Sequence, residues 1–307
     1  ADDQPLMPWL EQHIWPLEAA HVSAGFVRDG VELAIAEMIR SGTTTFSDMY
    51  FFPDACAETA QRLGMRCQIT FPILDFPTVW ARSADEYISK GLALRDAIKH
   101  SQLVSVGFGP HATYTVNEAN LVKVATLAAE LDIAVQIHLH ETRGEVLLAV
   151  EQNGERPLAM LQRLGLLGPR TQCVHMTDLG EQDIALLAAV GAHVVHCPQS
   201  NMKLASGACP VTRLLAQGIN VALGTDSAAS NNDLNLFGEM QSAALLAKLH
   251  SDDATALPAS EALAMATING ARALGLEDSI GSLEPGKLAD LIAVDLTQPE
   301  TQPLYNP

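Results

Sequence analysis

The sequence predicts an α/β fold, a (β/α)8 TIM-like barrel whose first strand is missing from the chain. Seven short apolar runs alternate with helical stretches, a pattern typical of a parallel sheet. Each run stops at a polar residue, and in such barrels the reactive side chains gather at the carboxyl ends of the strands. Those residues are Asp48, Thr70, His111, His138, His175, His196 and Asp226. Because eight strands close this barrel, seven leave one position open.

Composition places the chain among ordinary globular proteins. Its 307 residues are enough for one large core, and 48% of them are hydrophobic while 18% are charged. The formal net charge is −18, and a field of that sign repels nucleic acid and anionic membranes. The expected partner is therefore a small molecule, with neither nucleic acid nor a membrane involved.

Cysteine usage and the first residues predict a cytoplasmic protein. None of the five cysteines are spaced as a CxxC pair, which favours a reducing compartment without disulfides. Residues 1–12 are acidic and lack a secretory apolar core, and no apolar run is long enough to cross a bilayer. The apolar helices are compatible with a homodimer.

The N-terminal part predicts helices. Residues 5–20 mix aromatic and acidic side chains and predict short helices over a pocket. Residues 22–41 place Val31 and Ile35 on one face of a longer helix, and Gly42 ends it.

Strands and helices then alternate along the chain. The expected helices cover 54–64, 84–99 and 117–131, and Asn117 is a suitable N-cap for the last. Continuous Val, Ile and Ala runs suit strands buried on both faces. The expected strands are 43–48, 65–70, 103–110, 133–139, 171–176, 192–198 and 219–226.

The pattern changes near the C-terminus. Residues 280–296 combine a Pro-Gly turn with an apolar strand that ends at Asp295, which predicts a strand outside the barrel. We therefore expect a barrel domain over 1–279 and, over 280–307, a fragment of a small β-sandwich domain. Both ends of the chain are interpreted as clipped.

The segment 137–145, IHLHETRGE, is the most specific local signal. Side chains alternate along a strand, so His138 and His140 would share one face if the strand runs that far. An imidazole that binds metal and a carboxylate three positions later, Glu141, are two parts of a hydrolytic site. A buried structural histidine beside a surface glutamate explains the segment equally well when it is taken alone.

Three further residues extend this signal. Asp226 follows a strand directly and could bind a metal and accept a proton, although an Asx-turn carboxylate is common there. His175 and His111 are each more easily explained as structural histidines. Together with His138, however, they are four such residues at the ends of four strands of one barrel, which predicts a shared site.

Other motifs are less informative. His196 also ends a strand, and Ser200, Asn201 and Lys203 follow it, so this loop either lines the pocket or is a polar connection. The chain contains no Gly-rich phosphate loop and no GxSxG elbow, which removes support for a serine hydrolase.

These motifs together resemble the amidohydrolase superfamily. In chain order they are HLHETRGEV, the VHM around His175, HCPQSNMKLASG, GTDSAASNN and SLEPGKLADLIAVD. They are most similar to 5′-methylthioadenosine/S-adenosylhomocysteine deaminases, and the likeness covers essentially the whole chain, including GTTTFSDMYF and GPHATYT. Triazine hydrolases and guanine deaminases share much of the pattern, so the substrate is less specified than the superfamily.

The resemblance implies zinc-dependent hydrolytic deamination of the adenine ring of methylthioadenosine, S-adenosylhomocysteine or adenosine. The products would be ammonia and the inosine-type analogue. In this reading His138 is a zinc ligand, and Asp226 is both a ligand and a proton carrier. Glu141 passes a proton to the purine ring, and His175 holds the attacking water.

The resemblance also implies which residues bind the substrate. His111 would contact it, beside Glu141 and Asp226. Trp9 would cover the nucleoside, and Glu18 would hold the ribose hydroxyls. These last two residues favour an adenosyl substrate over a bare base.

One departure from the family pattern concerns the metal. The family's His-x-His supplies two zinc ligands and should lie just before Ala1. A zinc held only by His138 and Asp226 would be weak, because catalytic zinc usually has three protein ligands. We interpret the chain as lacking that segment, and iron or manganese would also suit these donors. The alternatives are action on guanine, a pterin or a triazine, or an inactive barrel if the pair is truly absent.

Overall fold

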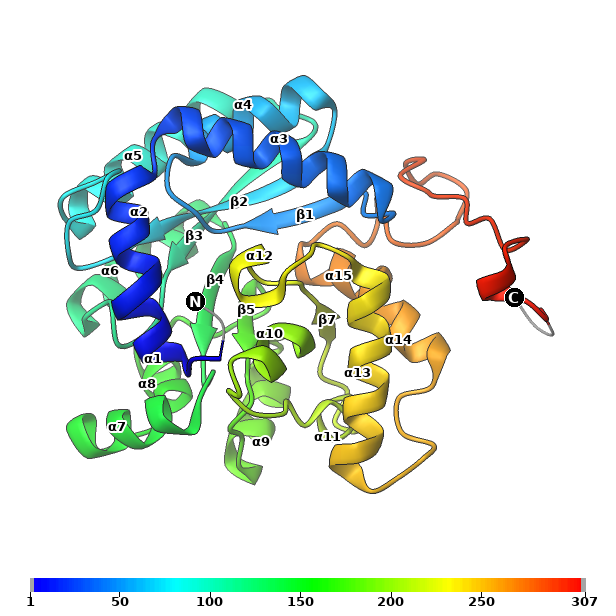
Figure 1. Cartoon of the computed structure of the whole chain (residues 1–307). Helices are drawn as coiled ribbons and strands as arrows, with labels where there is room; N and C mark the ends of the chain where they lie inside the picture. Colours follow the sequence, from blue (N-terminus) through cyan, green and yellow to red (C-terminus); the bar gives the residue numbers. More distant parts are fainter. Residues whose placement is uncertain (1–2, 305–307) are drawn as a thin grey trace.

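The computed structural model describes residues 3–304, and it confirms the expected parallel sheet. The seven strands pair in chain order, so β1 and β7 are the outer strands, and the sheet curls with helices around it (Figure 1). This is the (β/α)8 pattern with seven strands. The strands are β1 (Thr45–Asp48), β2 (Arg66–Ile73), β3 (Val104–Pro110), β4 (Val135–Leu139), β5 (Thr171–His175), β6 (His193–His196) and β7 (Val221–Leu223).

The helices follow the strands as the sequence predicts. Asn117 caps its helix as expected, since its side chain accepts a hydrogen bond from the Asn120 N–H at 3.0 Å. No helix within 3–304 has both the length and the apolar character needed to cross a membrane.

The N-terminal half of the chain contains α1 (Leu6–Trp9), the π-helix η1 (Leu10–Ile14), α2 (Trp15–His21), α3 (Ala24–Arg40), α4 (Pro53–Leu63), α5 (Ala84–Ile98), α6 (Glu118–Leu131), α7 (Arg143–Asn153) and α8 (Pro157–Arg163). The C-terminal half contains α9 (Glu181–Val190), α10 (Pro198–Lys203), α11 (Val211–Ala216), α12 (Ala228–Asn231), α13 (Leu236–Ser251), α14 (Ala259–Ala266), α15 (Ile268–Ala273) and the 3-10 helix η2 (Pro299–Thr301).

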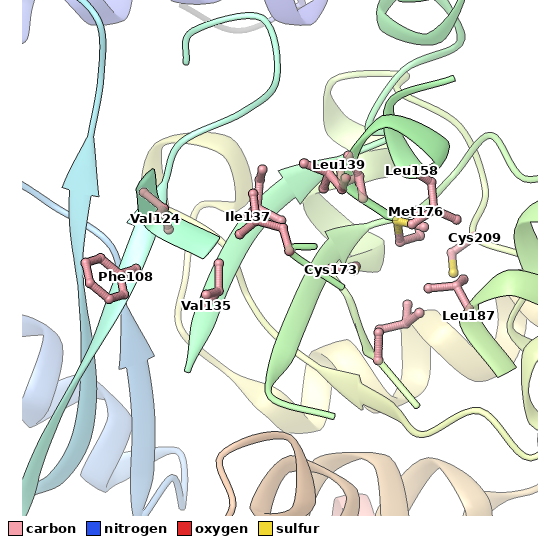
Figure 2. Packing of buried hydrophobic residues seen from close by; sticks show 14 of the residues in the cluster. Phe108, Val124, Val135, Ile137, Leu139, Leu158, Cys173, Met176, Leu187 and Cys209 are labelled. Carbon is pink, nitrogen blue, oxygen red and sulfur yellow. The ribbon is translucent and has the colours of Figure 1, made fainter. Parts of the chain in front are cut away.

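The main core lies between the sheet and the surrounding helices. Figure 2 shows part of it, where Ile137 and Leu139 of β4 pack near Leu158 of α8. Phe71 and Phe108 meet edge to face, with ring centroids 5.0 Å apart. A Cβ at Gly91 would lie 2.3 Å from the Phe71 ring, so only glycine lets α5 approach β2 this closely. This packing fixes the strands whose ends carry the polar residues.

The expected C-terminal strand is not formed. Residues 281–298 have neither helix nor strand, and Leu283, Leu291 and Val294 are exposed. In Figure 1 this segment passes beside the end of α3 before the chain extends away from the barrel toward the C-terminus. The physical reason is that a strand needs a neighbour to pair its N–H and C=O groups, and no described strand lies beside it. The division into domains 1–279 and 280–307 stays a prediction, and residues 1–2 and 305–307 lie outside the described part.

Candidate active site

A large cavity lies at the carboxyl ends of the strands. Its volume is about 1410 Å³, and it continues along the open seam between β1 and β7. Thr70 and His196 are not among its lining residues, but the residues to which the resemblance assigns a role all line it, from four strand ends and from the N-terminal helices. They are Trp9, Glu18, His111, His138, Glu141, His175 and Asp226.

His138 lies on β4 and presents one ring nitrogen to the cavity. Its Nδ1 is 2.8 Å from the main-chain oxygen of His111. Because a carbonyl only accepts hydrogen bonds, Nδ1 carries the hydrogen and Nε2 keeps its lone pair. Burial, followed by the nearby charge of His175, lowers the pKa of His138. The ring is therefore the neutral imidazole that metals bind.

His175 is the last residue of β5 and lies opposite His138. The two rings are stacked, with centroids 5.5 Å apart. Its Nδ1 is 2.8 Å from Oδ1 of the buried Asn201, which leaves Nε2 facing the cavity, 3.7 Å from the Glu141 carboxylate. The sequence analysis left open whether Asn201 belongs to the pocket. The structure gives it the role of orienting His175.

Glu141 follows β4 and its side chain is buried. Burial, and then the negative charge of Asp226, raises the pKa of Glu141 to about 8, while His138 acts in the opposite direction. Glu141 therefore carries a proton at neutral pH. A buried, protonated carboxyl group beside an imidazole is suited to general acid catalysis.

Glu145 holds the loop that carries Glu141. Its carboxylate accepts hydrogen bonds from the main-chain N–H of Glu141 at 2.7 Å and from that of His140 at 3.1 Å. Thr142 caps α7 by accepting from the Glu145 N–H at 3.1 Å. The sequence analysis missed Glu145, although the spacing Thr142-x-x-Glu145 is the signature of a capped helix start.

Asp226 lies in the loop after β7, beyond the strand end, with a positive φ of 59°. Its carboxylate accepts hydrogen bonds from Ser200 Oγ at 2.6 Å and Ser230 Oγ at 2.9 Å, and from the Ser227 N–H at 2.7 Å. Burial opposes its ionisation, but His175, His138 and these hydrogen bonds outweigh burial and keep the pKa of Asp226 below its usual value. Asp226 is therefore an ionised acceptor.

His111 is beside His138, with ring centroids 5.0 Å apart. Burial, and then the charge of His138, lowers its pKa to about 3, so the ring is neutral. Its Nδ1 is 3.0 Å from Thr115 Oγ1, and Tyr114 meets the ring edge-on. His111 can therefore offer a hydrogen bond to a ligand without introducing a positive charge.

The N-terminal helices bring Trp9 and Glu18 to the same cavity. Trp9 is buried against Leu10 and Leu204, and Glu18 accepts a hydrogen bond from Tyr50 Oη at 2.8 Å. Burial raises the pKa of Glu18, and the Tyr50 hydrogen bond opposes that effect. The sequence analysis did not identify Tyr50. The π-helix η1 separates Trp9 from Glu18, and such segments are frequent at functional sites.

His140 does not share the cavity-facing side of His138, because the strand does not run as far as that expectation required. Strand β4 ends at Leu139, and His140 has a positive φ of 49° that turns its side chain away. Its Nδ1 bonds the Asp178 main-chain oxygen at 2.8 Å, and its Nε2 accepts from the Leu158 N–H at 3.1 Å. His140 is a buried structural histidine.

The donor chemistry at His138 and Asp226 fits zinc. An imidazole nitrogen and a carboxylate oxygen are both ligand types that zinc accepts. Across residues 3–304, however, no three His, Cys, Asp or Glu side chains are grouped so that they could hold a metal ion. These two side chains therefore fit a zinc site only with further donors, and the His-x-His expected before Ala1 stays a prediction.

Behind the site, the buried Glu239 of α13 links two of its loops. Its carboxylate accepts a hydrogen bond from the Gln199 N–H at 3.3 Å and another from Asn231 Nδ2. Asn231 Nδ2 also donates to the Thr225 main-chain oxygen at 2.7 Å. Glu239 thus connects the loop of Asn201 with that of Asp226. Burial is the main cause that raises its pKa to about 7.

We expect Glu239→Gln to weaken the pH dependence of stability. Between about pH 4.5 and 7 the folded state keeps the Glu239 proton and the unfolded state loses it, so stability falls as pH rises through this window. A shift of this size corresponds to about 3 kcal/mol at most. Glutamine cannot titrate, so the Tm of the variant should fall less steeply than that of the wild type. Equal slopes would contradict this role, and Glu130→Gln, at an exposed position of α6, is the control.

Comparison with known proteins identifies the family. Residues 1–306 match the amidohydrolase family. A 5-methylthioadenosine/S-adenosylhomocysteine deaminase of Teredinibacter turnerae is 58% identical over 307 residues, which cover 100% of this chain and 70% of the relative. A 5′-deoxyadenosine deaminase of Methanothermobacter thermautotrophicus is 43% identical over 307 residues, covering 100% of this chain and 71% of the relative.

A solved structure agrees with these relatives. An adenosine deaminase from Xanthomonas campestris, with bound zinc, superposes with a TM-score of 0.98 at 53% identity, covering 100% of this chain and 70% of that chain. The resemblance inferred from the motifs is thereby confirmed. At this identity and coverage, the chain belongs to the amidohydrolase family.

Proposed function

We propose that this chain carries the active site of a zinc-dependent deaminase of methylthioadenosine and related adenosine nucleosides. The observation that carries the proposal is the pairing of a protonated Glu141 with an ionised Asp226 in one cavity, beside His138 and His175. Hydrolytic deamination needs a group that gives a proton and a group that takes one. The names of the relatives support the adenosine class of substrate.

In this proposal four side chains share the chemistry, and Asp226 has two roles. A zinc ion held by His138 and Asp226 with further donors would lower the pKa of water toward neutrality. Asp226 accepts a proton from the water that attacks C6. That proton then passes to the amino group on C6, and the C–N bond breaks to release ammonia. Glu141 donates its proton to the ring nitrogen beside C6 of adenine, which makes that carbon electrophilic. The Nε2 atom of His175 orients the water.

Residues of the N-terminal helices would hold the nucleoside in the same cavity. The Glu18 carboxylate, fixed by Tyr50, can accept hydrogen bonds from two neighbouring ribose hydroxyls. Trp9 provides an apolar surface near it, and His111 supplies a neutral hydrogen-bonding ring close to Glu141. A bare base such as guanine has no use for Glu18, so these contacts favour a riboside.

The test is ammonia release from methylthioadenosine, S-adenosylhomocysteine, adenosine and guanine by the intact protein, with and without added zinc. We expect metal-dependent turnover of adenosine nucleosides and none of guanine. The absence of ammonia release from every adenosine nucleoside would contradict the proposal. Turnover of guanine alone would favour the alternative heterocycle reading.

Three finer features belong to the same proposal. Iron or manganese could replace zinc, because imidazole and carboxylate suit all of these metals. Five free, buried cysteines support the cytoplasm as the compartment. A homodimer is supported by exposed leucines such as Leu33 and Leu249, and mass measurement in solution would test it.

A further inference from the structure

Apolar side chains surround the end of the cavity beside Glu18. Ile14 of η1 and Trp15 of α2 come from one side, and Phe76 and Val79 come from the loop after β2. We call these four residues the apolar subsite. Trp15 and Phe76 face each other with ring centroids 5.9 Å apart. Phe76 is 36% exposed and Val79 38% exposed, so the surface they form is open to a ligand.

The position of the apolar subsite follows from the helix that carries Glu18. Trp15 lies three residues before Glu18 on α2, so the two side chains are neighbours on one face, about 5–6 Å apart at their Cβ atoms. In a ribose, the carbon bearing the 3′-hydroxyl is two bonds from the 5′-carbon. A nucleoside whose hydroxyls bind Glu18 therefore places its 5′-substituent beside Trp15 and Phe76.

The charge of the cavity limits what that substituent can be. Among the lining residues that the structure describes, the charged groups are carboxylates and none is a lysine or arginine. Glu18, Asp48 and Asp226 contribute to this negative character, whereas Glu141 carries a proton at neutral pH. A ligand carboxylate placed against apolar side chains without a cation loses its hydration and gains no partner, which is unfavourable.

We infer that the apolar subsite selects adenosine nucleosides with a short, neutral, apolar 5′-substituent, such as a methylthio group. It disfavours the amino-acid tail of S-adenosylhomocysteine, which carries a carboxylate and an ammonium group, because both charges would lose hydration against these apolar side chains. This inference rests on the proposed deaminase function and narrows it. The relatives' names cover both kinds of tail.

The first experiment compares kcat/KM of the intact, zinc-loaded protein on methylthioadenosine, adenosine and S-adenosylhomocysteine. We expect methylthioadenosine to exceed S-adenosylhomocysteine by at least about tenfold, and adenosine, with its polar 5′-hydroxyl, to lie below methylthioadenosine. Equal or better use of S-adenosylhomocysteine would overturn the inference and leave the deaminase proposal standing. Failure on all three substrates would overturn both.

The second experiment changes the charge of the apolar subsite. Phe76→Arg places a cation where the carboxylate of the longer tail would lie, so the ratio of kcat/KM values should move toward S-adenosylhomocysteine by about tenfold. Leu17→Arg is the matched control, because Leu17 is also on α2 but is 55% exposed and outside the cavity lining. If Phe76→Arg does not fold, Val79→Arg replaces it as the variant that introduces the cation. A folded variant at either position with an unchanged ratio would overturn the inference.

Discussion

Replacing Glu141 with glutamine is expected to lower kcat for methylthioadenosine by about 10²–10⁴-fold. The amide has nearly the shape of the acid but cannot give up a proton to the purine ring. Because burial and Asp226 hold the pKa of Glu141 near 8, the wild-type side chain is already neutral at pH 7, and glutamine preserves that charge. The variant should therefore fold with an unchanged or slightly higher Tm.

The measurement is steady-state ammonia release, with Tm and bound zinc recorded for the same preparations. Glu151→Gln, at an exposed position of α7, is the control and should keep wild-type kcat. A Glu141→Gln protein with near-normal kcat would remove Glu141 from the mechanism. A large fall in Tm would instead mean that the carboxyl group serves the fold through contacts that glutamine cannot replace.

The strand ends could be predicted because they depend on local pattern and simple geometry. Apolar runs of strand length that stop at His138 and His175 are buried on both faces, and parallel strands bring their carboxyl ends together. The structure places both residues at the cavity, as expected. Asp226 also lines the cavity, although β7 stops at Leu223 and a loop carries the side chain.

The supporting residues could not be predicted, because their partners are far away in the sequence. Tyr50 reaches Glu18 across 32 positions, and Asn201 reaches His175 across 26. No local pattern specifies which hydroxyl or amide meets a given side chain. The orientation of His140 could not be predicted for a different reason. Its positive φ turns the side chain away from the face that strand alternation would give it.

The strand expected before Asp295 shows that β-propensity alone does not produce a strand. Its apolar residues favour a strand, but a strand is stable only when a neighbour satisfies its main-chain groups. Within residues 3–304 the segment pairs with no strand, although Asp290 forms an ion pair with Arg66 at 2.7 Å and Ile292 lies against Gly42. The outer strands β1 and β7 illustrate the same limit. Their local sequence predicts a strand but does not specify which strand would pair with the free edge.

Replacing Asp226 with asparagine is expected to reduce both activity and zinc binding. The carboxylate is the ionised acceptor of the site, held by Ser200, Ser230 and the Ser227 N–H. Asparagine keeps the size but loses the charge, so zinc affinity should fall by about 10–100-fold or more. Without a proton acceptor, kcat should fall by about 10²–10⁴-fold. Metal content after dialysis and ammonia release would measure the two effects.

Excess zinc separates the two roles that Asp226 has in the proposal. If Asp226 were a ligand only, raising the zinc concentration would restore kcat in Asp226→Asn as the site fills. If it also accepts the proton, kcat stays low at full zinc occupancy, and this is the result we expect. Ser230→Ala removes one hydrogen bond to Asp226 Oδ2 and keeps the carboxylate, so kcat should fall only about tenfold. An Asp226→Asn protein that retains both zinc and turnover would show that this carboxylate serves neither role.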